Sequence, residues 1–200
     1  MASNGVVHVI DKVLIPPEQT IKEFISKETQ LDLLHGIYDK MNQSLISLFE
    51  RRDTAYTWFL PSSKAIESHL KGMGMTSQSI KTHHDGKEIK RRDTTATEGA
   101  KIADNEPQAI RVIEDCLWSH FIDSPLVLTS DVPREGLTLR KETDKQSGLT
   151  ILMKGTGFGG EGGLGGDLEY MIKEYESKLV KTNRITVNGV VHVVDRVFCK

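Results

Sequence analysis

A chain of 200 residues, of which 38% are hydrophobic and 27% charged, is long enough to form one domain with a buried core. Its net charge of −2 and pI of about 6.4 provide no basic field that would attract nucleic acid or an anionic membrane. No apolar run approaches the ~20 residues of a membrane-spanning helix. Composition therefore indicates a globular protein and does not point to one class of function.

The first predicted element is a strand that occurs again near the other end of the chain. Residues 4–13 read NGVVHVIDKV and residues 188–197 read NGVVHVVDRV, with eight identical positions. In each copy an Asn-Gly turn leads into a β-branched run with apolar residues on both sides, which predicts a strand buried on both faces. The identities include Asn, Gly, His and Asp, and they favour a tandem repeat over a coincidence.

The elements between the two copies change from helical to extended. Apolar residues at helical spacing predict helices over 18–49, and residues 56–60 predict a short buried strand. Ser62 or Ser63 then begins another helix. The polar segment at about 72–105 predicts a long loop or insertion.

The second half begins with an amphipathic helix that Pro107 initiates. The second NGVVHV strand follows three strand-like runs, a glycine-rich stretch and a helix-like run. The strand-like runs are 126–132, 136–142 and 148–154, and the helix-like run is 168–180. Helices followed by strands, with one early strand, predict an α+β fold.

Three segments stand in order along the chain: YTWFLPSSKAI at 56–66, CLWSHFIDSPL at 116–126 and NGVVHVVDRVF at 188–198. Together they resemble the conserved parts of the fasciclin (FAS1) family of extracellular adhesion modules. The resemblance implies a FAS1-like α+β module over 18–200, with N-terminal helices packed on a compact β-sandwich or wedge. Residues 1–17 are then the trailing strand of a preceding module.

The resemblance also implies two insertions, at about 72–105 and 155–176, and assigns roles to individual residues. The structural motif residues are Pro61, His120, Asn188, Gly189, His192 and Asp195. The predicted partner-binding residues are Trp118, Ser119, His120, Phe121 and Ile122, with His120 favoured as structural. The chain departs from the family where Ser119 replaces the Tyr of a Tyr-His pair, and where Arg184-Ile185 replaces an Asp-Ile pair of integrin-binding members.

The implied function is extracellular adhesion, at the cell surface or in secreted form. The expected partners are cell-surface or matrix proteins, integrin-like receptors among them, or a second copy of the chain. No enzymatic activity, cofactor or nucleic-acid partner is expected. A signal peptide and any membrane anchor are expected outside these residues, and the alternative of a complete intracellular chain stays open.

Other motifs carry weaker hypotheses. GTGFGG at 155–160 satisfies G-x-G-x-x-G and supports the rival hypothesis of a nucleotide-binding enzyme, although a glycine-rich linker is favoured. No metal site is expected from His69 and His83-His84-Asp85, and KEIKRRD at 87–93 is interpreted as a solvated loop.

Two further candidates are modifications. Asn42-Gln43-Ser44 is a glycosylation sequon. Cys116 and Cys199 are a candidate disulfide, and the sequence alone leaves open whether they pair.

Overall fold

The fold consists of five helices and seven strands within the described part of the computed structural model. The described residues are 16–75, 106–123, 126–133, 136–140, 148–155 and 168–199. The helices are α1 (Ile21–Lys27), α2 (Asp32–Tyr38), α3 (Gln43–Glu50), α4 (Ser63–Gly72) and α6 (Glu106–Leu117). The strands are β1 (Tyr56–Pro61), β2 (Phe121–Ile122), β3 (Leu137–Arg140), β4 (Gly148–Gly155), β5 (Leu168–Ile172), β6 (Ser177–Thr186) and β7 (Gly189–Val194).

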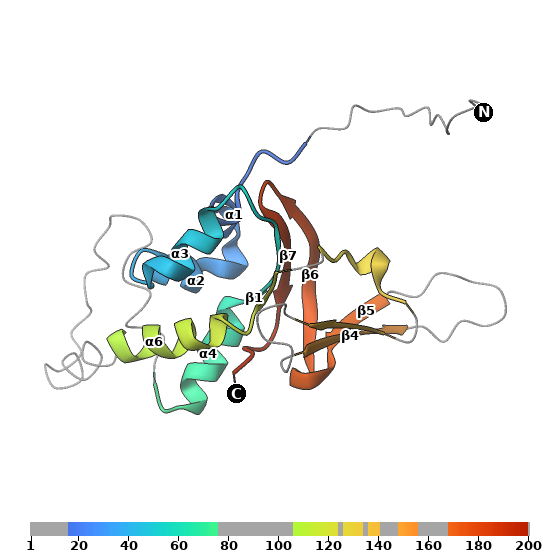
Figure 1. Cartoon of the computed structure of the whole chain (residues 1–200). Coiled ribbons are helices and arrows are strands. Elements are labelled where there is room, and N and C mark those ends of the chain that lie inside the picture. Colours follow the sequence, from blue (N-terminus) through green and yellow to red (C-terminus); the bar gives the residue numbers. More distant parts are fainter. Residues whose placement is uncertain are drawn as a thin grey trace, which may run out of the picture.

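The strands form one sheet in the order β2-β1-β7-β6-β5-β4-β3. β1 and β7 are parallel, whereas the other described pairs are antiparallel. Only Met171↔Lys178 and Ile172↔Ser177 pair β5 with β6, so this short ladder joins the two halves of the sheet. In Figure 1 the helices cover one side of β1 and β7, and β4 and β5 extend away on the other side.

Local sequence explains where the helices begin. Thr20 and Glu23 form a reciprocal capping box at the start of α1. The side chain of Ser62 accepts a hydrogen bond from the Ala65 N–H and caps α4, directly after Pro61 ends β1. The predicted strand at 56–60 and the helix that follows it are confirmed.

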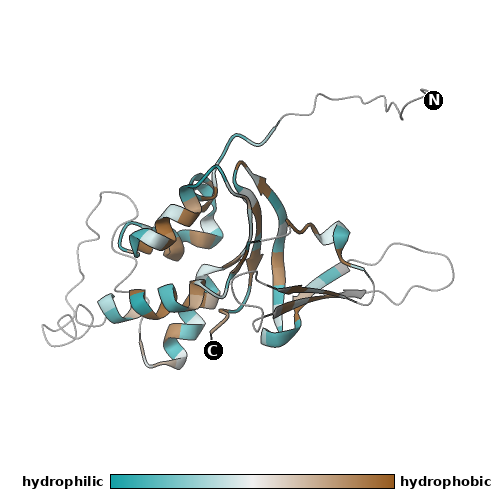
Figure 2. Cartoon of the chain, in the orientation of Figure 1, coloured by the Kyte–Doolittle hydropathy of each residue, from teal (hydrophilic) through white to brown (hydrophobic). Residues whose placement is uncertain are grey.

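Two apolar clusters form the core, one on each side of β1 and β7. Trp58 of β1 packs with Val191 and Val193 of β7 in the cluster beneath the helices. Phe59 and Val194 belong to the second cluster, which β3, β4 and β5 complete. Every residue of β7 is buried, which confirms the prediction of a strand buried on both faces. Figure 2 shows the apolar side of the helices turned toward the sheet.

The helix predicted at 168–180 is wrong, because this segment forms β5, a 3-10 turn at Lys173–Tyr175 and the start of β6. Its apolar residues recur at helical spacing, but pairing with a distant strand prevails: Ile151↔Ile172 and Met153↔Tyr170 align β4 with β5. The insertion predicted at 155–176 therefore contains part of the sheet from Leu168 onward.

The strand predicted at 126–132 is also wrong. Residues 126–128 have no regular structure and Thr129–Asp131 form a 3-10 turn. Side chains bind the backbone N–H groups that a ladder would use: Val127 N–H donates to Thr57 Oγ1 at 3.0 Å, and Thr129 N–H donates to Asn183 Oδ1 at 2.8 Å. These acceptors come from β1 and from β6, so the backbone N–H groups are satisfied without a strand partner.

Several predictions concern residues outside the described part of the chain. They are the first strand copy at 4–13, most of the polar segment from residue 76 onward with His83, His84, Asp85 and 87–93, and residues 156–160 of the glycine motif. Within the described part, no helix has the length and apolar character needed to cross a bilayer.

Candidate functional site

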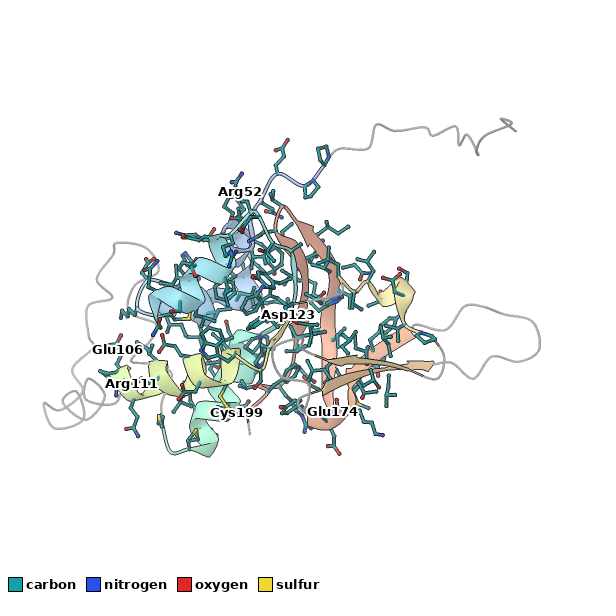
Figure 3. All side chains as sticks on the ribbon, viewed as in Figure 1. Arg52, Glu106, Arg111, Asp123, Glu174 and Cys199 are labelled. Carbon is teal, nitrogen blue, oxygen red and sulfur yellow. A yellow bond between two sulfur atoms is a disulfide. The ribbon has the colours of Figure 1, made fainter. Side chains whose placement is uncertain are left out.

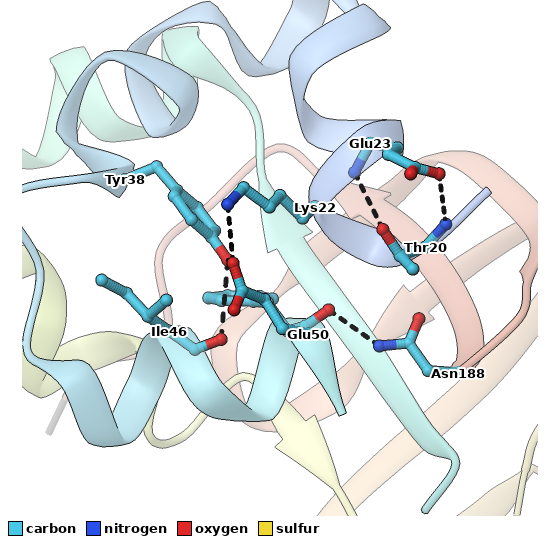
Figure 4. Close-up of polar contacts among 8 residues, drawn as sticks. Thr20, Lys22, Glu23, Tyr38, Ile46, Glu50 and Asn188 are labelled. Atoms are coloured by element: carbon cyan, nitrogen blue, oxygen red, sulfur yellow. Dashed lines mark hydrogen bonds and ion pairs between the residues drawn. The ribbon is translucent and has the colours of Figure 1, made fainter. Parts of the chain in front are cut away.

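One buried amide joins the closing segment, residues 188–199, to two helices. Asn188 Oδ1 accepts a hydrogen bond from the Ile21 N–H at 3.0 Å, and its Nδ2 donates to the Phe49 carbonyl at 2.7 Å. Figure 4 shows Asn188 and the bond that its Nδ2 donates. Ile21 lies in the first turn of α1 and Phe49 in the last turn of α3, where backbone groups lack intrahelical partners. Asn188 therefore caps both helices from the end of the chain.

Gly189 is required by the close approach of β7 to β1. Its φ is +152°, and a Cβ at this position would overlap the carbonyl oxygen of Tyr56. Only glycine fits where two backbones approach so closely. The Asn-Gly pair thus has two separate structural roles. The side-chain amide of Asn188 caps two helices, and Gly189 lets β7 approach β1 because it has no side chain.

His120 links three elements from a fully buried position. Its Nδ1 bonds the Phe59 carbonyl of β1, and its Nε2 accepts from the Phe198 N–H at 2.7 Å. A carbonyl only accepts and an amide only donates, so the ring is neutral with its proton on Nδ1. The imidazole also stacks on Phe198 at a centroid distance of 4.1 Å. These contacts are those of a structural residue.

His192 and Asp195 do not meet, although they lie in one strand region. His192 Nε2–H donates to the Val127 carbonyl at 2.9 Å, and burial lowers the pKa of His192 below its ordinary value. Asp195 is exposed and accepts from the Lys178 N–H at 2.7 Å and from Ser177 Oγ at 3.1 Å. Each side chain fixes a different neighbouring segment, and they form no catalytic dyad.

Cys116 and Cys199 are joined as a disulfide, with their Cα atoms 4.8 Å apart. The bond ties the end of α6 to the end of the closing segment; Figure 3 shows Cys199 beside α4 and α6. His69 of α4 lies next to it, with Nε2 3.8 Å from Cys116 Sγ.

The predicted partner-binding residues divide into two groups. Trp118 is 40% exposed and Ser119 is half-buried, just after α6 ends. His120, Phe121 and Ile122 are buried, so Trp118 and Ser119 are the members of this set whose side chains reach the surface, and partner binding stays a prediction. Phe121 and Ile122 form β2, which pairs with β1 and turns both side chains into the core.

The exposed face of α6 leads from Trp118 toward a shallow groove. Arg111 and Glu114 precede Trp118 by seven and four positions, so helical geometry places all three on one side. Residues 40–42, between α2 and α3, form the opposite wall of a groove of about 460 Å³. The Asn42 N–H donates to Glu114 and Lys40 pairs with Glu106, so polar contacts hold the two walls together.

Comparison with known proteins identifies the fold. No protein-family model matches the chain. Over 80 residues, 38% of the chain, it is 39% identical to stabilin-2 of Mus musculus, of which it spans 3%. The whole chain matches the structure of a FAS1 domain pair from the insect cell adhesion molecule fasciclin I, with a TM-score of 0.55, 14% identity and 57% of that chain covered. The chain has a FAS1 fold. The FAS1-like α+β prediction is confirmed, and the predicted module boundaries stay predictions.

One structural pair of this fold was missed by sequence reasoning. Asn183 of β6 has a left-handed φ of 54° at an irregularity in the β6–β7 ladder. Its Nδ2 donates to Thr129 Oγ1 at 2.6 Å, which anchors the segment at 126–132. Asparagine is depleted in strands and tolerates left-handed backbone, so an Asn within a strand-like run is the signal that could have indicated a bulge.

Proposed function

We propose that this FAS1 module is an extracellular adhesion unit that binds a cell-surface or matrix protein through the face of α6 that ends at Trp118. The fold likeness to an insect cell adhesion molecule supports the class of function. The observation that carries the site is the 40% exposure of Trp118, because an accessible tryptophan beside a polar rim is a common anchor of protein interfaces.

The surroundings of Trp118 suit this role. Its ring lies against Phe121, with centroids 6.0 Å apart, so the indole has an apolar support beneath it. Arg111 and Glu114 provide charges of both signs on the same helix face. The complementary partner surface therefore carries an apolar or aromatic side chain for the indole, with polar groups around it.

The test compares Trp118→Ala with Val180→Ala in the full chain. Val180 is another large exposed apolar side chain, on β6, and serves as the matched control. Beads coated with each variant are tested for attachment to cells and matrix proteins, and for self-aggregation, which reports binding between copies. Truncation of an interface anchor weakens binding by about 2 kcal/mol or more, or roughly 30-fold. Full adhesion by a folded Trp118→Ala protein would refute the site.

The elements on either side of the glycine motif do not support the nucleotide-binding alternative. A dinucleotide fingerprint needs a strand, the glycines and then a helix that crosses to a parallel strand. Here Gly155 ends β4, and the next described residue, Leu168, begins its antiparallel partner β5. The glycine-rich segment therefore connects two paired antiparallel strands, an arrangement that does not support nucleotide binding.

A further inference from the structure

Three soft-metal ligands from distant parts of the sequence meet at the disulfide. His69 comes from α4, Cys116 from the last turn of α6, and Cys199 from the end of the closing segment. Their ligand atoms all lie within 4.8 Å of one another. Cys116 is buried, whereas His69 and Cys199 are half-buried, so the site lies just beneath the surface.

The spacing between His69 and Cys116 is that of two ligands on one ion. Zn²⁺ binds thiolate sulfur at about 2.3 Å and imidazole nitrogen at about 2.0–2.1 Å in a tetrahedron, which separates the nitrogen from each sulfur by about 3.6 Å. The His69 Nε2 to Cys116 Sγ distance is 3.8 Å. The same geometry separates the two sulfurs by about 3.8 Å. Once the disulfide is reduced, rotation of the side chain of Cys199 can bring the sulfurs to this separation, because Cys199 follows β7 in irregular structure.

We propose that the reduced chain binds one Zn²⁺ ion through His69 Nε2 and the thiolates of Cys116 and Cys199, so that disulfide and metal are alternative states of one site. A dithiol reductant gives two electrons and two protons to the disulfide and becomes a disulfide itself. Zn²⁺ then displaces one proton from each cysteine thiol. Neutral His69 supplies the third ligand, and water takes the fourth position of the ion.

Charge favours this ion in this place. Two thiolates balance the charge of Zn²⁺, so the complex is neutral and suits a site that is partly removed from solvent. Thiolate and imidazole ligands select Zn²⁺ over Mg²⁺ or Ca²⁺, which prefer oxygen. Oxidising surroundings keep the disulfide, and reducing surroundings open the metal site.

The experiment uses the full chain, reduced with a phosphine and kept without oxygen. Co²⁺ is the probe, because thiolate coordination to Co²⁺ gives a charge-transfer absorption and tetrahedral geometry gives intense visible bands. We expect one Co²⁺ per reduced chain with both signals, displaced by Zn²⁺, and neither signal in the oxidised chain. His69→Ala should weaken binding by at least the ~10–100-fold that loss of an outer partner costs. His35→Ala, a half-buried histidine on α2, should leave it unchanged.

A second measurement applies where the reduced chain unfolds in the absence of metal. The melting temperature of the reduced chain is compared with and without Zn²⁺, in the wild type and in His69→Ala. We expect Zn²⁺ to raise the melting temperature of the wild type much more than that of the variant. Equal Zn²⁺ effects in both proteins, or no effect and no thiolate signal in either, would overturn the proposal.

Discussion

Replacing Asn188 by alanine tests whether one side chain holds the two ends of the module together. The change removes the acceptor of the Ile21 N–H and the donor to the Phe49 carbonyl, both of which are buried. A buried polar group left unpaired costs about 1–3 kcal/mol, so the expected loss is about 2–6 kcal/mol. A domain of this size has about 5–15 kcal/mol in total, and its melting temperature should fall by roughly 10 °C.

Urea unfolding, followed by circular dichroism, measures the loss, and Asn42→Ala is the control. Asn42 is an exposed cap with one side-chain bond, to the Ser44 N–H at 2.8 Å, so its loss should cost about 1 kcal/mol. In Asn188→Asp the introduced carboxylate faces the Phe49 carbonyl at neutral pH, and protonation at lower pH restores a donor. The deficit of this variant should therefore shrink as the pH falls. An Asn188→Ala protein no less stable than Asn42→Ala would show that the double cap contributes little.

Three other predictions follow from the same geometry. Burial lowers the pKa of His192 below 6.5, so the stabilisation that comes from neutral His192 is complete above about pH 6.5 and falls on further acidification by up to about 1.4 kcal/mol per pH unit. His192→Gln should flatten this part of a plot of urea midpoint against pH. An unchanged plot would contradict a neutral, buried His192. Gly189→Ala should destabilise the fold by about 4 kcal/mol or more, measured by thermal unfolding. Gly72→Ala should be close to neutral, because a Cβ there meets open space. Comparable losses in the two variants would argue against the overlap of a Cβ at position 189 with the Tyr56 carbonyl. In a secretory host, Asn42→Gln and Ser44→Ala should both remove a glycan seen by mass spectrometry, but only Asn42→Gln should lose about 1 kcal/mol; an unmodified wild-type chain would rule out the sequon.

The sequence predicted those elements whose residues carry their own local signal. The β-branched run at 189–194 and the short run at 56–60 form the parallel strand pair, β7 and β1. The apolar spacing after Pro107 formed α6, which begins one residue earlier, at Glu106. In each of these cases the local period and the final environment agree.

Local signals failed where distant partners determine the structure. The run at 168–180 has helical spacing, and only pairing with β4 makes its first part a strand. Likewise, Phe121 continues the helical spacing of Ile113 and Leu117 in sequence, but it forms the edge strand β2 because β1 is beside it. The two bonds of Asn188 span 167 and 139 residues, so no window of sequence contains them.

The proposed binding residue and the proposed metal site meet at the end of α6, and this placement has a physical consequence. Trp118 lies between Cys116, held by the disulfide, and His120, held by backbone bonds from β1 and the closing segment. A side chain presented from a backbone fixed on both sides loses little further freedom when a partner binds, which favours affinity. Opening the disulfide would release one of these two supports and leave the other. Adhesion through Trp118 should therefore weaken on reduction and recover when Zn²⁺ links Cys116 to His69 and Cys199, because the metal again ties the helix end to the closing segment.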